Sequence, residues 1–138
     1  MPSKDLFHQA VRIALEKETW LITDDPLHLS FGNLNFYIDL GAEEIIAAEK
    51  NQRQIAIEIK SFLSPSVVAD FHTALGQFLN YRLVLQEKQP ERVLYLAVPD
   101  DIYQSFFQFD FPKMARQHYQ LKLIIYDSVN EVILLWIE

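Results

Sequence analysis

An almost wholly apolar run, RVLYLAV at residues 92–98, constrains the fold of this chain most strongly. Such a run is typical of a strand covered on both faces, as in the middle of a sheet between two layers. The segment before it, 67–87, carries an apolar stripe at helical spacing, and a strand beside such a long helix predicts a sheet flanked by helices. The stripe consists of Val68, Phe71, Leu75, Phe78 and Leu79.

The remaining elements fit the same plan. Ser64-Pro65 provides a cap followed by proline, which predicts the start of the long helix. Further helices are expected at 4–18 and at 100–119, the latter in two pieces interrupted near Phe111-Pro112. Gly41 is expected to close the strand at 35–40. The order predicts one mixed α/β domain over residues 1–138. Strands are expected at 20–23, 27–31, 35–40, 45–50, 54–62, 92–98, 121–126 and 131–136, with the runs 45–50 and 54–62 and the last two runs forming hairpins.

Composition excludes several classes of protein. The chain has no cysteine, so disulfides and thiolate metal sites are ruled out. Its longest purely apolar run, 132–137, is too short to cross a bilayer, and its start lacks the features of a signal peptide, so a soluble, cytoplasmic protein is expected. The formal charge of −7, from 12 basic and 19 acidic residues, repels phosphate on average. Any contact with DNA therefore requires a locally basic site, bound cations or a partner.

Strand periodicity at 54–62 separates apolar from charged residues. Ile55, Ile57 and Ile59 share one face. Ala56, Glu58 and Lys60 share the other, and the face of 35–40 that carries Tyr37 also carries Asp39. If these two strands are neighbours, the carboxylates of Asp39 and Glu58 converge, with Lys60 one step further along.

Two carboxylates and the backbone carbonyl of Ile59 form an all-oxygen set that suits Mg²⁺ or Mn²⁺ rather than zinc. Phosphodiester cleavage builds negative charge on phosphoryl oxygens, which a divalent ion stabilises while activating a bound water. Asp39 and Glu58 are then the metal ligands, and Lys60 positions the water or the phosphate. The competing interpretation is an ordinary charged pair on an exposed sheet face, worth about 0.2–1 kcal/mol.

On the long helix, Gln77 and Tyr81 are one turn apart and point the same way. Both are expected to lean over the acids, holding a phosphate or orienting Lys60. Alternatively, Tyr81 borders the core and Gln77 is solvated.

These residues carry a resemblance to known families. Asp39, then Glu58-Ile59-Lys60, then Gln77-xxx-Tyr81 resembles the PD-(D/E)xK nuclease superfamily, in particular branches similar to the RecB nuclease domain. More closely, the chain resembles the XisH family of DNA-element excision controlling factors. The stretches that carry this likeness are FYIDLGAE (36–43), IAIEIKSF (55–62), FHTALGQFLNYR (71–82), ERVLYLAVP (91–99) and YQLKLIIYD (119–127).

The resemblance implies a restriction-endonuclease-like fold and a role in excising a DNA element by site-specific recombination, beside a separate recombinase and a companion protein, XisI. It places metal ligation on Asp39 and Glu58, catalysis on Lys60 and support on Gln77 and Tyr81. An acid of the first helix recurs in related nucleases, and Glu16 is the candidate here. Two alternatives remain open: a non-catalytic adaptor that keeps the fold and regulates a recombinase through protein contacts, and a toxin-like nuclease neutralised by its companion.

Other polar and aromatic residues support no separate site. Glu43, Glu44 and Glu49-Lys50 compete with the two acids as ligands, although a solvated pair is the better interpretation of Glu49-Lys50. A dense aromatic set is expected to be mostly core, with a part left for an interface with a partner or a second copy. That set is Tyr103, Phe106, Phe107, Phe109 and Phe111. The histidines His8, His28, His72 and His118 show no metal-ligand spacing.

Overall fold

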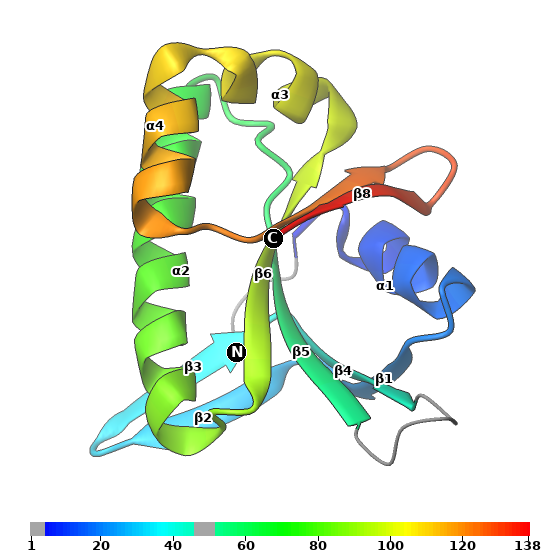
Figure 1. Cartoon of the computed structure of the whole chain (residues 1–138), viewed down its shortest axis with the longest axis vertical. Coiled ribbons are helices and arrows are strands. Elements are labelled where there is room, and N and C mark those ends of the chain that lie inside the picture. The colour runs from blue at the N-terminus through cyan, green and yellow to red at the C-terminus, as the bar shows by residue number, and fades with distance from the viewer. Residues whose placement is uncertain (1–4, 46–51) are drawn as a thin grey trace.

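The structure is a computed structural model that describes residues 5–45 and 52–138 (Figure 1). Its helices are α1 (His8–Lys17), α2 (Val67–Lys88), α3 (Asp100–Gln104), the single-turn η1 (Phe106–Gln108) and α4 (Asp110–Tyr119). Its strands are β1 (Leu21–Asp24), β2 (Leu27–Phe31), β3 (Leu34–Ile38), β4 (Leu40–Ile45), β5 (Gln52–Ile59), β6 (Arg92–Pro99), β7 (Leu123–Asp127) and β8 (Val132–Ile137).

Six strands form one sheet in the order β1-β4-β5-β6-β7-β8, while β2 and β3 pair separately. The central strands β5, β6 and β7 are parallel, and the outer pairings are antiparallel. Figure 1 shows α2 and α4 on one side of the sheet and α1 on the other. This arrangement confirms the predicted mixed α/β sheet flanked by helices.

The sheet separates two apolar cores because alternate side chains of each strand point to opposite faces. Ile55, Ile57 and Ile59 pack towards Val11 and Leu15 of α1. On the other face, Ala56 and Leu96 of the sheet share a core with residues of α2, η1 and α4, namely Phe71, Phe78, Phe107 and Ala115. The predicted burial of β6 on both faces is confirmed, since six consecutive residues from Leu94 to Pro99 are buried.

The predicted strand at 35–40, closed by Gly41, is wrong. The strand is interrupted at Asp39, because β3 ends at Ile38 and β4 begins at Leu40, and Gly41 lies inside β4. A Cβ on Gly41 would stand 2.9 Å from Asp24 Oδ2 and 3.0 Å from Arg92 Nη1. Glycine therefore serves close packing here and does not form a turn.

The first predicted hairpin exists with a shifted start, because β4 pairs antiparallel with β5 from Leu40 opposite Ile57. Residues 46–51, which include most of the predicted strand 45–50 and the Glu49-Lys50 pair, lie outside the described residues. The second predicted hairpin is confirmed as β7 and β8.

Two predicted helix signals are displaced. Ser66, and not Ser64, caps α2, because its hydroxyl accepts a hydrogen bond from the Ala69 backbone N–H. The helix interruption falls between α3 and α4, while Pro112 lies in the first turn of α4. Proline is tolerated there because a first-turn N–H has no partner within the helix.

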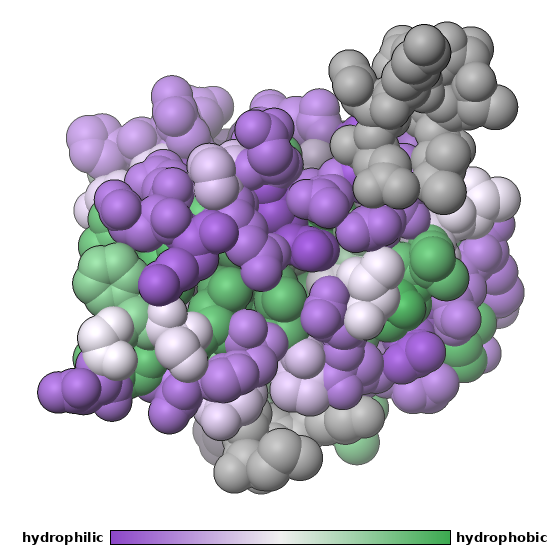
Figure 2. All heavy atoms as spheres, turned by 90° about the horizontal axis from the view of Figure 1, so that it is seen from below, coloured by the Kyte–Doolittle hydropathy of each residue, from purple (hydrophilic) through white to green (hydrophobic). Residues whose placement is uncertain are grey.

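The surface is largely hydrophilic on the side where β2, β3 and the end of α2 lie, with apolar residues showing between polar ones (Figure 2). Phe106 and Phe107 of the aromatic set are buried, as expected, whereas Phe109 and Phe111 are exposed. Among the helices of the described ranges, none has both the length and the apolar character needed to cross a bilayer.

Candidate functional site

The β4–β5 pairing brings together two acids that are far apart in the sequence. Leu40 pairs with Ile57, so one residue further on Asp39 stands opposite Glu58. Asp39 Oδ2 accepts a hydrogen bond of 2.7 Å from the Ile59 backbone N–H. In return, Glu58 Oε1 lies 3.3 Å from the Asp39 backbone nitrogen, which donates to it. The side-chain hydrogen bonds replace the strand ladder here, which explains the break between β3 and β4.

Burial changes the acid–base chemistry of this pair. Glu58 is only 7% exposed, and burial followed by the neighbouring charge of Asp39 raises its pKa to about 9. Burial also raises the pKa of Asp39, although the hydrogen bond from Ile59 opposes the change. The hydrogen bond between the two side chains favours a proton on Glu58 and a charge on Asp39. Perturbed pairs of this kind are characteristic of functional sites, where a cation or a proton must relieve the repulsion.

Lys60 and Tyr81 border the acids. The positive charge of Lys60 acts on Glu58 and lowers its pKa, so the ammonium lies within electrostatic reach of that carboxylate. Burial, followed by the charges of Glu58 and Asp39, raises the pKa of Tyr81 to about 12. Tyr81 also packs edge-on against Phe36 of β3, with ring centroids 6.4 Å apart.

Gln77 lies one turn before Tyr81 on α2, on the same side of the helix. Its Oε1 atom is buried and has no hydrogen-bond partner among the described residues. A buried amide oxygen without a partner is rare and requires an explanation such as a bound ion, water or ligand.

The segment at the start of α1 supplies two polar neighbours that the sequence analysis missed. Asp5 Oδ2 accepts a hydrogen bond of 2.9 Å from the Ser61 backbone N–H, and its charge raises the pKa of Asp39. His8 is buried and lowers the pKa of Asp39, while its Nε2 lies 2.7 Å from Asp25 Oδ1. A signal for His8 existed, because it lies at helical spacing with buried apolar residues of α1.

The remaining sequence candidates have other contacts. Glu16 is exposed and faces Arg12 at 3.8 Å, one turn away on α1. Glu43 accepts a hydrogen bond from the Gln54 side chain, and Glu44 lies 3.7 Å from an Arg53 nitrogen. Within 5–45 and 52–138, no three side chains of the His, Cys, Asp or Glu type are grouped to hold a metal ion. Any such site would rest on two carboxylates and additional oxygen atoms.

Fold and site together define a class: a mixed α/β protein in which a buried glutamate of the sheet meets a half-buried aspartate beside a tyrosine of a long helix. The chain belongs to the XisH family, because the family model described as XisH protein matches residues 1–134. The resemblance seen in the sequence is thereby confirmed for this family.

Two solved structures are similar to the chain over nearly its whole length. An XisH family protein from Nostoc punctiforme is 52% identical, with a TM-score of 0.88, and the match covers 97% of this chain and 100% of that one. An fdxN element excision controlling factor protein from Anabaena variabilis is 48% identical, also with a TM-score of 0.88, over 98% of this chain and 100% of that one. A search of the curated proteins gives no match.

Proposed function

We propose that this protein is an excision controlling factor in site-specific DNA recombination, with a metal-dependent nuclease site at Asp39, Glu58 and Lys60. The first part is supported by the similar protein from Anabaena variabilis, which bears that name. The observation that carries the second part is the meeting of the half-buried Asp39 with the buried Glu58, with the charge of Lys60 close by. Acids of neighbouring strands beside a lysine, below a helix with Gln77 and Tyr81, also support a restriction-endonuclease-like fold of the PD-(D/E)xK type.

The residues present fit a hard divalent cation such as Mg²⁺. Oxygen ligands are what Mg²⁺ prefers, and the Asp39 and Glu58 carboxylates with the Ile59 carbonyl would hold it. The raised pKa of Glu58 indicates that the pair lacks a compensating positive charge in its anionic form. When bound, the ion would stabilise charge on a phosphoryl group and lower the pKa of a water molecule.

The chain's own residues have distinct roles in this proposal. The Lys60 ammonium binds a phosphate oxygen or orients a water molecule beside Glu58. The Tyr81 phenol keeps its proton at neutral pH, since its pKa lies near 12, and it therefore acts as a hydrogen-bond donor. The Gln77 amide holds a further polar group through its buried, unpartnered oxygen.

Cleavage of plasmid and branched DNA in the presence of Mg²⁺ tests the nuclease site. Wild type is expected to cleave, and Lys60→Ala is expected to lose at least tenfold of the rate, because a positioned charge is removed. Lys17→Ala, an exposed lysine of α1 that binds the Asn130 carbonyl, is the matched control and should cleave normally. Equal rates for wild type and Lys60→Ala, with and without the companion XisI, would contradict the nuclease site.

A second candidate function is a non-catalytic adaptor that regulates a recombinase through protein contacts. It is favoured by the backbone hydrogen bonds that both acids already make, which give the pair a structural role across β4 and β5. It predicts that Lys60→Ala supports element excision as well as wild type does in cells. Reduced excision with normal binding of XisI would argue for the nuclease site instead.

A further inference from the structure

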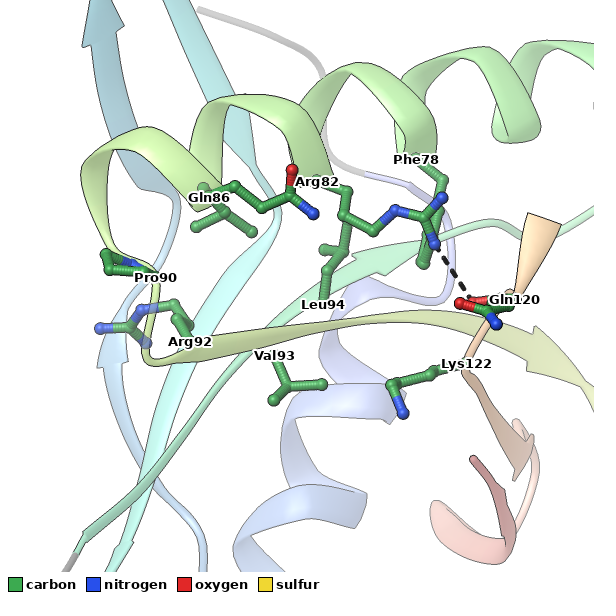
Figure 3. A pocket seen from close by; sticks show the side chains of 10 residues that line it. Phe78, Arg82, Gln86, Pro90, Arg92, Val93, Leu94, Gln120 and Lys122 are labelled. Atoms are coloured by element: carbon green, nitrogen blue, oxygen red, sulfur yellow. Dashed lines mark hydrogen bonds between the residues drawn. The ribbon is translucent and has the colours of Figure 1, made fainter.

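The central strands of the sheet differ in length, and the difference leaves a notch. Residues 54–59 of β5 pair with β6 from Arg92 onwards, whereas β7 first pairs with β6 at Leu96. The first part of β6 therefore has a neighbouring strand on one side only. Its other side opens between the C-terminal half of α2 and the segment that leads into β7, as Figure 3 shows.

Two adjoining cavities of about 180 and 660 Å³ occupy this notch, and the larger one extends along α4. They share Arg82 and Gln86 of α2 and Gln120 and Lys122 of the segment before β7. The larger cavity is also lined by Arg116 and Gln117 of α4, by Leu121 and by Glu138.

Positive charge is concentrated here although the chain is acidic overall. Arg82, Arg92, Arg116 and Lys122 are four of the 12 basic residues of the chain. Arg82 donates to the carbonyl oxygens of Tyr119 and Gln120 and thus stays oriented without losing its charge. Within the described part of the chain, no carboxylate pairs with Arg82, Arg116 or Lys122.

Two lining residues do not contribute to the free charge. Arg92 is buried, donates to the Ile55 carbonyl and lies 4.0 Å from Asp24, so it is part of the framework. Glu138 is the acid of the larger cavity, and it contacts the Tyr95 hydroxyl and Arg53. Its charge is therefore partly compensated before any ligand arrives.

The mostly polar lining of the larger cavity indicates the class of ligand. Interfaces with nucleic acid are polar and positively charged, and arginine, lysine and glutamine side chains donate to phosphate oxygens. Protein partners, in contrast, are usually held by buried aromatic and apolar anchors, and Leu121 is the apolar residue of the larger cavity. We propose that this cationic notch, formed by Arg82, Arg116 and Lys122 with Gln86 and Gln117, binds the phosphate backbone of DNA.

The notch borders the N-terminal ends of β6 and β7, whereas the acid pair lies near the C-terminal end of β5. Glu58 pairs with Leu96 and Leu96 with Leu123, so Lys122 lies two strands from Glu58, about 10 Å at the usual spacing between strands. That span corresponds to about three steps of a DNA duplex. The choice of DNA as ligand rests on the proposed function, but the notch requires neither metal nor cleavage.

Fluorescence anisotropy with a labelled duplex oligonucleotide, measured over a salt series without Mg²⁺, tests the notch. Wild type is expected to bind with an affinity that falls steeply with salt. Arg116→Gln combined with Lys122→Gln should weaken binding at least tenfold and reduce the slope of log K against log salt by about two, because two phosphate contacts are lost. Lys17→Gln combined with Lys88→Gln is the matched control, because it removes the same charge at residues that line neither cavity, and it should retain the wild-type slope.

Three outcomes would overturn the proposal that the notch binds DNA. They are no duplex binding by wild type at low salt, the same loss of affinity in the control variant, or equally strong binding of polyglutamate at the same residues. Thermal unfolding of both variants shows whether they remain folded. The two proposals can fail separately, because binding is measured without Mg²⁺ and the double variant keeps Asp39, Glu58 and Lys60. Absence of cleavage with normal binding would contradict the nuclease site alone, and normal cleavage with unaltered binding by the double variant would contradict the notch alone.

Discussion

The two ends of the parallel strands carry opposite charges in opposite surroundings. At one end, Glu58 is buried and Asp39 is half-buried, and burial, followed for Glu58 by the charge of Asp39, raises their pKa values. At the other end, Arg82, Arg116 and Lys122 border open cavities. Burial shifts the pKa of an acid, because the charged form loses its hydration. A charged side chain at an open cavity keeps its charge and can attract an oppositely charged ligand. Measurements of the free energy of unfolding distinguish the buried acids from the exposed basic residues.

The largest effect on stability is expected from a core residue of α2. Phe78 of this helix is 1% exposed, and the Arg82 guanidinium lies over its ring, 5.3 Å from the ring centroid. Phe78→Ala should lower the free energy of unfolding by about 3–5 kcal/mol, because it leaves a cavity in the core. Urea denaturation measures the loss. Leu83→Ala, at an exposed position of the same helix, should change stability by less than about 0.5 kcal/mol, and similar losses in both variants would contradict this packing.

The pH dependence of stability addresses the acid pair alone. The pKa of Glu58 rises from 4.5 to about 9 on folding, so the folded state holds a proton that the unfolded state releases between these values. The stabilising contribution is complete below pH 4.5 and declines as the pH rises towards 9, by about 1.4 kcal/mol per pH unit.

Glu58→Gln lacks this titration, so wild type should lose stability relative to Glu58→Gln between pH 5 and pH 8. Urea unfolding at several pH values measures the difference. Added Mg²⁺ should stabilise wild type at neutral pH and leave Glu58→Gln unchanged, because a ligand that binds only the folded state shifts the equilibrium. Parallel pH profiles for the two proteins would show that the pair is not protonated as described.

A smaller effect on stability is expected from the N-cap of α2. Ser66→Ala should cost about 1 kcal/mol, because the Ser66 hydroxyl accepts the Ala69 backbone N–H at the start of α2. Ser64→Ala is the control, since the Ser64 hydroxyl donates to the exposed Ser66 carbonyl and the backbone N–H of Ser64, which donates to Asp70, is retained in the variant. Thermal unfolding compares the two variants, and a larger loss for Ser64→Ala would restore the cap expected from the sequence.

The smallest effect is expected at the cationic end. Lys122→Gln should change the free energy of unfolding by less than about 0.5 kcal/mol, because the ammonium makes no ion pair within the described residues. The same urea titration measures it. A loss above 1 kcal/mol would indicate that Lys122 stabilises the fold and would remove the contrast between the ends.

Local periodicity explains what could be predicted from the sequence. The alternation in β5 correctly separates Ile57 and Ile59 from Ala56, because side-chain direction in a strand depends only on position. It also places Glu58 on the face towards α2. The predicted nearness of Asp39 to Glu58 is confirmed, although Asp39 lies between β3 and β4 and not within a strand at 35–40.

Contacts between distant segments explain what could not be predicted. The break at Asp39 depends on a hydrogen bond from Ile59, which no local pattern reveals. Asp5 reaches Ser61 across 56 residues. The cationic notch depends on the different lengths of β6 and β7, and Arg82 and Lys122 come together only when both strands are in place.

The hairpin origin of the acid pair sets an order of events as the chain folds. Asp39 and Glu58 are 19 residues apart and meet through β4 and β5, a short loop closure. The parallel pairing of β5 with β6 must wait for the crossover through α2, because it closes a longer loop. We therefore expect the two acids to come together while they are still hydrated and to lose water only when α2 docks. On this expectation the pair assembles early in folding, and its raised pKa values arise late.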